Sequence, residues 1–250
     1  MIRLSHFAFD EKQWSSLEEV PFQLPFLQAH RGYWVKGQPQ NSLGSAQAAF
    51  AQNFKMTELD LRLTHDKQII LFHDLQILDT DQVFKVSDLT LSELRNLIPV
   101  STLTELFEKA PQQLLFNLEI KNETKTQFAL EEQLIAFFKK HSSWKERILF
   151  SSFNPFSLGW LKQLAPEIPR ALLVTQEKEY SIFLKEMSFL PLVKPHFINV
   201  RWEDLDHYKE IPPDRKAIWT LNDLSFAKTL KSHQKVASII TDEILPADLK

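Results

Sequence analysis

The chain has 250 residues, of which 44% are hydrophobic and 24% charged, and its formal net charge is -3. This balance is typical of a globular protein and argues against a disordered chain, and the small net charge gives no electrostatic basis for binding nucleic acid. Cysteine is absent, which excludes disulfides and thiol catalysis and favours a cytoplasmic location. No apolar run approaches the ~18 residues of a membrane helix, so we expect no integral membrane segment.

Short apolar segments alternate along the chain with amphipathic segments of helical spacing. The strand candidates are residues 26–30, 56–63, 68–73, 113–120, 147–153, 170–175, 196–200, 216–221 and 236–241. Helical spacing is clearest at residues 43–54, 103–109, 128–140 and 226–231. Helix N-caps are predicted at Asn41-Ser42 and Ser101-Thr102, and Asn154-Pro155 begins a further helix.

This alternation predicts parallel strands covered by helices. If residues 68–73 form a hairpin arm inside a loop, eight principal strands remain, which favours a closed (β/α)8 TIM barrel over an open sheet. No low-complexity linker divides the chain, so we expect one domain over residues 1–250. Its N-terminal extension, residues 1–25, is expected to cross or cap the bottom of the barrel.

Charged residues recur with period 2 near the ends of two predicted strands. Glu58, Asp60 and Arg62 share one side of their strand, opposite leucines, and Glu119 and Lys121 share one side of theirs. The apolar sides suit the helix layer, so the charged sides are expected to face the barrel mouth. A barrel carries its chemistry at this end of the strands.

Two interpretations fit the three carboxylates. Glu58, Asp60 and Glu119 would repel one another unless a cation lay between them, and an all-oxygen ligand set without cysteine indicates Mg²⁺ or Ca²⁺ rather than zinc. Alternatively, the acids form structural ion pairs with Arg62, Lys121 or Arg31. The spacing of the residues alone leaves both interpretations open.

Two of the 8 histidines stand out from the rest. His30 and His73 each close an apolar strand candidate and are followed at once by a charged residue, Arg31 or Asp74. Each is either a catalytic histidine or a core residue with its hydrogen bonds satisfied. The other histidines have polar, terminal or turn surroundings, or stand beside a proline, and receive no role.

An ordered series of short motifs then resembles the glycerophosphodiester phosphodiesterase family from about residue 26 to the C-terminus. The motifs are 29-AHRG-32, 39-PQNS-42, 58-ELD-60, 73-HD-74, 118-LEIK-121, 151-SSF-153, 219-WTLN-222 and 240-ITD-242. The resemblance implies a (β/α)8 barrel with a small insertion after the second strand, at about residues 64–100. It also implies hydrolysis of glycerophosphodiesters to glycerol 3-phosphate and an alcohol.

The resemblance also implies a role for individual positions. His30 and His73 match the family's acid–base pair, and we lean towards His30 as the base. The metal ligands match Glu58, Asp60 and Glu119. The phosphate-binding arginine and lysine match Arg31 and Lys121, and the aromatic residue at the mouth, which would contact substrate, matches Trp219. A small-molecule substrate is therefore the expected partner, and the oligomeric state is left open.

Gln40 departs from the pattern, because the family usually has glutamate at this position. Glutamine keeps a hydrogen-bonding side chain but removes a negative charge near the expected site. Two alternatives remain beside the hydrolase: a lysophospholipase D-like activity on lipid phosphodiesters, and a catalytically silent barrel that binds phosphorylated ligands. The intact set of two histidines and three acids favours an enzyme over the silent barrel.

Overall fold

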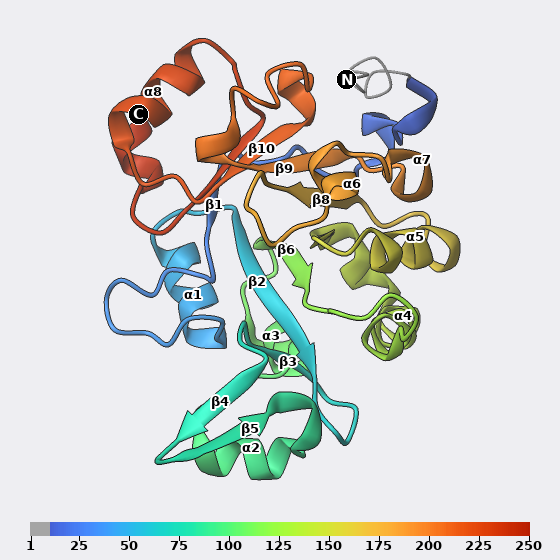
Figure 1. Ribbon diagram of the computed structural model, residues 1–250. Helices are drawn as coiled ribbons and strands as arrows, with labels where there is room; N and C mark the ends of the chain where they lie inside the picture. Colours follow the sequence, from blue (N-terminus) through green and yellow to red (C-terminus); the bar gives the residue numbers. More distant parts are fainter. Residues whose placement is uncertain (1–10) are drawn as a thin grey trace.

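Eight parallel strands close into a barrel in the computed structural model, which describes residues 11–250. The strands follow the order β1-β11-β10-β9-β8-β7-β6-β2, and pairing of β1 with β2 closes the circle (Figure 1). Their bounds are β1 Leu27–Ala29, β2 Met56–Leu63, β6 Leu115–Ile120, β7 Ile148–Ser152, β8 Arg170–Val174, β9 Phe197–Arg201, β10 Lys216–Trp219 and β11 Ser238–Thr241. The predicted TIM barrel is confirmed.

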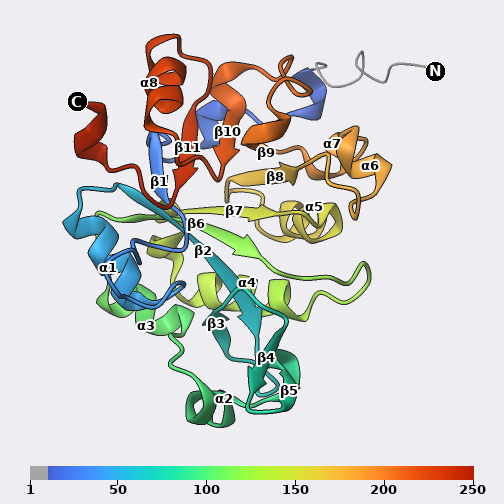
Figure 2. The same cartoon turned by 60° about the vertical axis from the view of Figure 1, so that its left-hand side comes forward.

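Helices connect most of the strands and surround the barrel (Figure 2). Their bounds are α1 Leu43–Ala51, α2 Leu91–Leu97, α3 Leu103–Lys109, α4 Ala129–Lys140, α5 Pro155–Leu164, α6 Ile182–Lys185, α7 Leu190–Val193 and α8 Leu224–Ser232. Between β9 and β10 the chain forms 3-10 turns instead of an α-helix. No helix in the described part of the chain is long and apolar enough to cross a membrane.

Three of the predicted helix starts are capped as expected. Ser42 and Thr102 accept hydrogen bonds from the backbone three residues on, and the Asn154 side chain caps α5 ahead of Pro155. The helix predicted over residues 43–54 ends earlier, at Ala51. Its continuation is interrupted near Asn53, whose φ of 67° is left-handed.

The segment after β2 forms a small substructure that projects from the barrel (Figure 1). Strand β3, Ile69–Leu71, pairs antiparallel with β2, which confirms the predicted hairpin arm. The hairpin of β4, Gln76–Asp79, with β5, Gln82–Lys85, was not predicted. A separate apolar cluster joins these strands to α2 and contains Ile70, Ile77, Val86 and Leu94.

The bottom of the barrel is closed by the chain that precedes β1. Apolar side chains between residues 17 and 24 pack against a layer from the beginnings of β2, β7, β8 and β9. The two sides of this contact are Leu17, Val20, Phe22 and Leu24 against Met56, Leu149, Ala171 and Phe197. Residues 17–24 of the expected extension therefore cover the N-terminal ends of these strands, and residues 1–10 lie outside the described part of the chain.

Candidate active site

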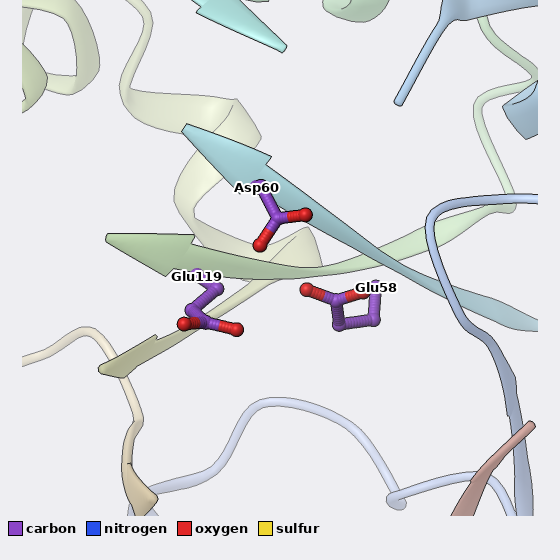
Figure 3. Close-up of side chains that lie close together, drawn as sticks. All are labelled: Glu58, Asp60 and Glu119. Carbon is purple, nitrogen blue, oxygen red and sulfur yellow. The ribbon is translucent and has the colours of Figure 1, made fainter. Parts of the chain in front are cut away.

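Three carboxylates meet at the C-terminal ends of two adjacent strands (Figure 3). Strands β2 and β6 are parallel neighbours, and their register places Asp60 beside Glu119, with Glu58 two residues earlier on β2. The exposed fractions of the residues are 3% for Glu58, 1% for Asp60 and 7% for Glu119. Each offers one oxygen within 4.8 Å of the others. The alternation of side chains along the two strands therefore predicted which three acids converge.

Two cations neutralise part of this cluster. The Lys121 Nζ atom lies 3.0 Å from Asp60 Oδ1 and 2.5 Å from Glu119 Oε1, and the Arg31 Nε atom lies 3.3 Å from Asp60 Oδ2. Burial alone would lower the pKa of Lys121, but the charges of Glu119 and Asp60 outweigh it and raise that pKa. Asp60 and Glu119 therefore form the ion pairs with Lys121 and Arg31 that one of the two interpretations of the carboxylates predicted.

Arg62 does not join these pairs. Its guanidinium lies 2.8 Å from Glu123 Oε1 and donates to the backbone oxygen of His73 at 2.8 Å. The residue thus holds the loop that carries His73 against the barrel. Its predicted pairing with the three acids is wrong, because the loops after β3 and β6 supply it with other acceptors.

Glu58 is left incompletely paired by these contacts. Its Oε2 atom accepts a hydrogen bond from the backbone N–H of Arg31, but its buried Oε1 atom has no hydrogen-bond partner among the described residues. Burial, together with the charge of Asp60, raises the pKa of Glu58 to about 8. A buried oxygen without a partner beside two further carboxylates fits the ligand set of a hard divalent cation.

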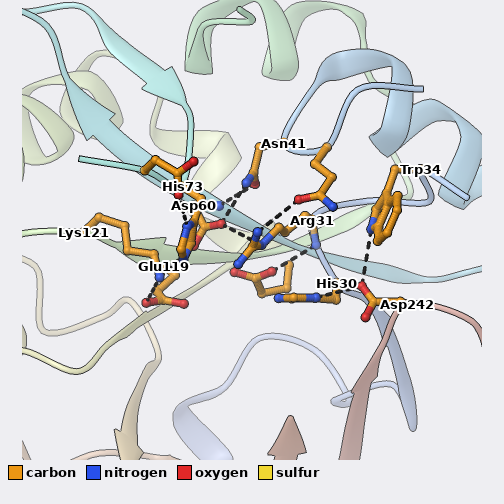
Figure 4. A network of polar contacts seen from close by, with 12 residues as sticks. His30, Arg31, Trp34, Asn41, Asp60, His73, Glu119, Lys121 and Asp242 are labelled. Carbon is orange, nitrogen blue, oxygen red and sulfur yellow. Dashed lines mark hydrogen bonds and ion pairs between the residues drawn. The ribbon is translucent and has the colours of Figure 1, made fainter. Parts of the chain in front are cut away.

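Asn41 holds Asp60 from two directions (Figure 4). Its Nδ2 atom donates to Asp60 Oδ2 at 2.7 Å, and its Oδ1 atom accepts from the Asp60 backbone N–H at 2.8 Å. Burial would raise the pKa of Asp60, but Lys121, His73, Arg31 and this hydrogen bond together lower it. Sequence reasoning assigned Asn41 to a helix cap, whereas the cap is Ser42 and Asn41 orients a carboxylate.

The turn at 30-HRG-32 has a clear steric cause. Arg31 and Gly32 both have positive φ, 54° and 78°, and a Cβ atom on Gly32 would lie 2.3 Å from Ser45 Oγ. Only glycine permits this approach. The Ser45 hydroxyl donates to the Arg31 backbone oxygen, and the Tyr33 N–H donates to the Ser45 backbone oxygen at 2.9 Å. The turn is therefore pinned to α1 and directs His30 and Arg31 into the mouth.

His30 is paired with an aspartate from the other end of the chain. Its Nδ1 atom lies 2.8 Å from Asp242 Oδ1, which also accepts from Trp34 Nε1 at 3.3 Å (Figure 4). Burial would lower the pKa of His30, but the hydrogen bond to Asp242 and the charge of Glu58 outweigh it and raise that pKa. With Nδ1 engaged, Nε2 is the ring nitrogen left for chemistry.

His73 follows β3 and has a carboxylate of its own. Its Nδ1 atom lies 2.7 Å from Asp74 Oδ1. Burial is the largest influence and lowers the pKa of His73, although the charge of Asp60 opposes it. The two histidines therefore have pKa values displaced in opposite directions from the ordinary value near 6.5.

One cavity of about 220 Å³ joins these groups. Its lining includes all the residues predicted for the site except Asp60, which lies behind it and contacts Arg31 and Lys121. Trp219 lies at the mouth and meets Phe153 edge to face, with ring centroids 5.5 Å apart, and Phe153 stacks on Tyr180.

A second hollow, of about 430 Å³, lies between residues 38–44 and 95–101. The charged side chain in its lining is Arg95, which pairs with Glu105.

Sequence reasoning missed three residues that act on this site. Asp242, in the motif 240-ITD-242, and Asn199, near the end of a predicted strand, received no role, and Asn41 was assigned to a helix cap. Only Asp242 carried a usable signal, because the last strand of a closed barrel lies beside the first, where His30 is found.

Gln40 makes direct contact with the site. Its Oε1 atom accepts a hydrogen bond from Arg31 Nη1 at 3.0 Å. The Gln40 side chain is exposed, and it contacts a different nitrogen of the guanidinium from Asp60, which lies beside Arg31 Nε. The residue that departs from the family pattern therefore helps to hold the guanidinium.

The (β/α)8 barrel, with two histidines and an acidic cluster at its mouth, matches a family of phosphodiesterases. The sequence model of the glycerophosphoryl diester phosphodiesterase family matches residues 30–197, more than half of the chain. The chain therefore belongs to this family, as its motifs predicted.

Individual relatives agree with this assignment. A glycerophosphodiester phosphodiesterase from Caldanaerobacter subterraneus subsp. tengcongensis is 32% identical over 160 residues, which span 58% of this chain and 65% of the relative. The crystal structure of a glycerophosphodiester phosphodiesterase from Thermotoga maritima has a TM-score of 0.70 at 25% identity, covering 87% of this chain and 94% of that one. A phosphodiesterase from Oleispira antarctica, in complex with the product sn-glycerol-3-phosphate, has a TM-score of 0.68 at 28% identity, covering 88% and 93%.

Proposed function

We propose that this protein hydrolyses glycerophosphodiesters to sn-glycerol 3-phosphate and an alcohol, with the help of a divalent cation. The observation that carries the proposal is the convergence of His30, His73, Arg31 and Lys121 with a buried carboxylate cluster around one small cavity. Membership of the family and the product bound to the Oleispira antarctica relative support the same substrate class.

The cation would be Mg²⁺ or Ca²⁺, held by Glu58, Asp60 and Glu119. The charges favour this arrangement: once all three carboxylates are ionised to hold the cation, they leave one negative charge with Lys121 and Arg31, and the divalent cation changes that to one positive charge. A phosphodiester monoanion then completes neutrality. When bound, such a cation withdraws charge from the phosphate oxygens and stabilises the charge that develops on them during displacement.

Arg31 and Lys121 would bind the phosphate group. A guanidinium presents donors in a fixed fork that matches two phosphate oxygens. Asp60 and Gln40 hold Arg31 from two sides, so its remaining N–H groups are fixed before substrate arrives. Lys121, the residue after β6, supplies a second donor that stays protonated because its pKa is raised.

His30 and His73 would transfer the protons. One removes a proton from the attacking hydroxyl, of water or of the glycerol itself, and the other protonates the departing alkoxide. The raised pKa of His30 favours it as the protonated partner, the acid, and the lowered pKa of His73 favours it as the base. This assignment is the reverse of the one towards which the sequence leaned.

Trp219 would border the substrate at the mouth. Its indole Nε1 donates to the Asn199 backbone oxygen at 3.1 Å, which fixes the ring plane, and Phe153 packs edge on against it. The cavity is smaller than the ~300 Å³ at which pockets for drug-sized ligands begin. This size favours a small diester over the acyl chain of a lysophospholipid.

The proposal also includes the bounds of the domain and the cellular compartment of the protein. We take residues 1–250 as one phosphodiesterase domain, with residues 1–25 as an extension and residues from about 64 to 100 as an insertion. We place the protein in the cytoplasm because the sequence has no cysteine.

A substrate panel measured with and without chelator tests the proposed function. We expect release of sn-glycerol 3-phosphate from glycerophosphocholine or glycerophosphoethanolamine, loss of turnover after chelation, and little turnover of lysophosphatidylcholine. A preference for the lysolipid would favour the lysophospholipase D-like alternative. Binding of phosphate compounds without any turnover would favour the silent barrel.

A further inference from the structure

Arg62 stands near the end of β2, between two strands that lead to proposed catalytic groups. On one side β2 pairs with β3, and His73 follows closely after the end of that strand. On the other side β2 pairs with β6, and Lys121 is the next residue after it. Arg62 is only 7% exposed. A charge buried to this extent needs hydrogen-bond partners, and they come from both neighbouring loops.

The guanidinium of Arg62 contacts the backbone of both loops. Its Nε atom donates to the backbone oxygen of His73 at 2.8 Å, and its Nη1 atom donates to the backbone oxygen of Lys121 at 3.4 Å. Nη1 also lies 2.8 Å from Glu123 Oε1, but the Glu123 side chain is 55% exposed, so solvent screens this ion pair. One planar group therefore joins the loop after β3 to the loop after β6.

The loop after β6 is anchored by contacts that do not involve Arg62. The Asn122 Nδ2 atom donates to both carboxylate oxygens of Glu131, at 2.9 and 3.1 Å, and Glu131 is fully buried in the first turn of α4. Asn154, ahead of α5, donates from its Nδ2 atom to the backbone oxygen of Asn122 at 2.8 Å. Two helices therefore hold this loop, and it gives the guanidinium a fixed support.

The loop after β3 is attached to β2 at the histidine. The Phe72 N–H donates to the Asp60 backbone oxygen at 2.9 Å, and Arg62 extends this attachment by one residue, to His73 itself. The His73 ring contacts Asp74, the following residue, whose side chain is 68% exposed. That contact moves with the loop, so it does not fix the ring relative to the barrel. The position of His73 therefore depends on its backbone contact with Arg62.

We propose that Arg62 is a positioning residue that links the loop of His73 to the loop of Lys121 and so sets the distance between the proton-transfer group and the phosphate-binding group. Arg62 acts through His73, because it holds the backbone of that residue. A displacement of a reacting group by about 1 Å costs on the order of 10²-fold in rate. The inference rests on the proposed function, in which His73 transfers a proton and Lys121 binds phosphate.

Steady-state kinetics of the metal-loaded protein on glycerophosphocholine test this role. We expect Arg62→Gln to lower kcat by about 10- to 100-fold and to change KM by less than about 3-fold, since His73 is displaced while the anchored Lys121 keeps its place. Arg62→Lys retains a charged donor for one of the two oxygens, so its kcat should lie between those of the wild type and Arg62→Gln.

The matched control is Arg147→Gln. The guanidinium of Arg147 also holds two backbone oxygens, those of Pro111 and Leu114 at 2.7 and 2.9 Å, but at the opposite end of the barrel. This exchange should lower the melting temperature and leave kcat and KM within about 2-fold of wild type. It therefore separates a loss of stability from a loss of positioning.

Two further measurements show whether Arg62 acts through the histidine. When Arg62→Gln is added to His73→Ala, kcat should stay within about 2-fold of His73→Ala alone, because the group that Arg62 positions is already absent. The NMR order parameter of the His73 backbone N–H, about 0.85 in a rigid backbone, should fall towards about 0.6 in Arg62→Gln and stay unchanged in Arg147→Gln. The second measurement does not depend on turnover.

A kcat for Arg62→Gln close to that of wild type, an equal loss in Arg147→Gln, or a further tenfold loss in the double variant would overturn the positioning role. If Arg62→Gln does not fold, Arg62→Lys takes its place, with an expected loss in kcat of about 3- to 10-fold. Absence of hydrolysis by the wild type, together with the selective fall in the order parameter, would overturn the proposed function and support the link between the loops. The two proposals can therefore fail separately.

Discussion

The imidazole of His30 and the carboxylate of Asp242 lie 2.8 Å apart, although 212 positions separate the two residues in the chain. Barrel closure produces this contact. Strand β1 pairs with β11, and the His30 backbone N–H donates to the Thr241 backbone oxygen at 2.9 Å. The first and last strands thus build one functional pair.

Replacing Asp242 by asparagine should lower the pKa of His30, because the hydrogen-bonded carboxylate is the largest influence that raises it. If His30 acts as the acid, the alkaline limb of the pH–rate profile moves to lower pH. If it acts as the base, the acidic limb moves to lower pH instead. We expect the alkaline limb to move, and kcat to fall at least about tenfold. The control is Asp79→Asn, at an exposed position of β4. A pH–rate profile in which neither limb moves would show that the contact with Asp242 does not set the pKa of His30 during turnover.

Removal of either histidine should lower kcat by at least ~10², because each removes a proton-transfer group rather than core volume. The variants are His30→Ala and His73→Ala, measured on glycerophosphocholine at substrate saturation. His65→Ala provides a control, since His65 is exposed in the turn between β2 and β3. Near wild-type rates for both active-site variants would show that the acid–base assignment is wrong.

Chelation should abolish turnover, and Mg²⁺ or Ca²⁺ should restore it, because the three buried carboxylates are the proposed ligands. Glu119→Gln should require a higher metal concentration for half-maximal rate, since it removes one of the three charges. Both effects are measured by metal titration of the initial rate. Full activity after exhaustive chelation would remove the cation from the mechanism.

Metal binding should stabilise the protein more as the pH rises from about 5 to about 8. In the metal-free fold, burial and the charge of Asp60 raise the pKa of Glu58 from 4.5 to about 8. The unfolded chain therefore loses this proton first, and the stability of the metal-free protein falls over that window. A bound cation takes the ionised carboxylate, so its contribution to the melting temperature grows over the same window.

Melting curves at several pH values, with and without saturating Mg²⁺, check this expectation. Glu58→Gln serves as the reference, because its metal-free stability should lose the part of the pH dependence that comes from Glu58. An increase in melting temperature that stays constant from about pH 5 to about pH 8 would argue against the buried Glu58 as a ligand.

Gln40→Ala should lower kcat/KM by about 3- to 10-fold, because Arg31 loses one of the two groups that hold it. Gln40→Glu keeps an acceptor at the same position and adds a charge, so kcat/KM should stay within about 3-fold of wild type. Steady-state kinetics of the three proteins at one metal concentration make the comparison. Identical values for all three would leave Gln40 with a structural role in its loop alone.

Local patterns in the sequence predicted most of the barrel and the acidic cluster. Alternation with period 2 is a property of one strand, and it placed Glu58 and Asp60 on the same face without any knowledge of neighbours. Helix caps such as Ser42 and Asn154 are equally local. For these features a few adjacent residues contain the whole physical cause.

Features that depend on side chains from distant elements were not predicted. The contact of Asn41 with Asp60 requires the loop after β1 to fold over β2, and the free amide of Asn199 depends on which residues lie beside it on the adjacent strands. The β4–β5 hairpin was missed for another reason. Its strands have four residues each and are mostly exposed, so they carry almost no apolar pattern.

The position of β1 has a consequence for any shortened form of this protein. The recognisable family pattern begins at His30, but Leu27–Ala29 form the strand that joins β11 to β2. A chain shortened only at its N-terminus, so that it begins at His30, would keep every proposed catalytic side chain and lose the closing strand. The open edges of β2 and β11 would then offer unpaired backbone groups to other molecules, which is the usual route to strand-mediated aggregation. The first residue of the family pattern is therefore not the first residue of the unit that can fold.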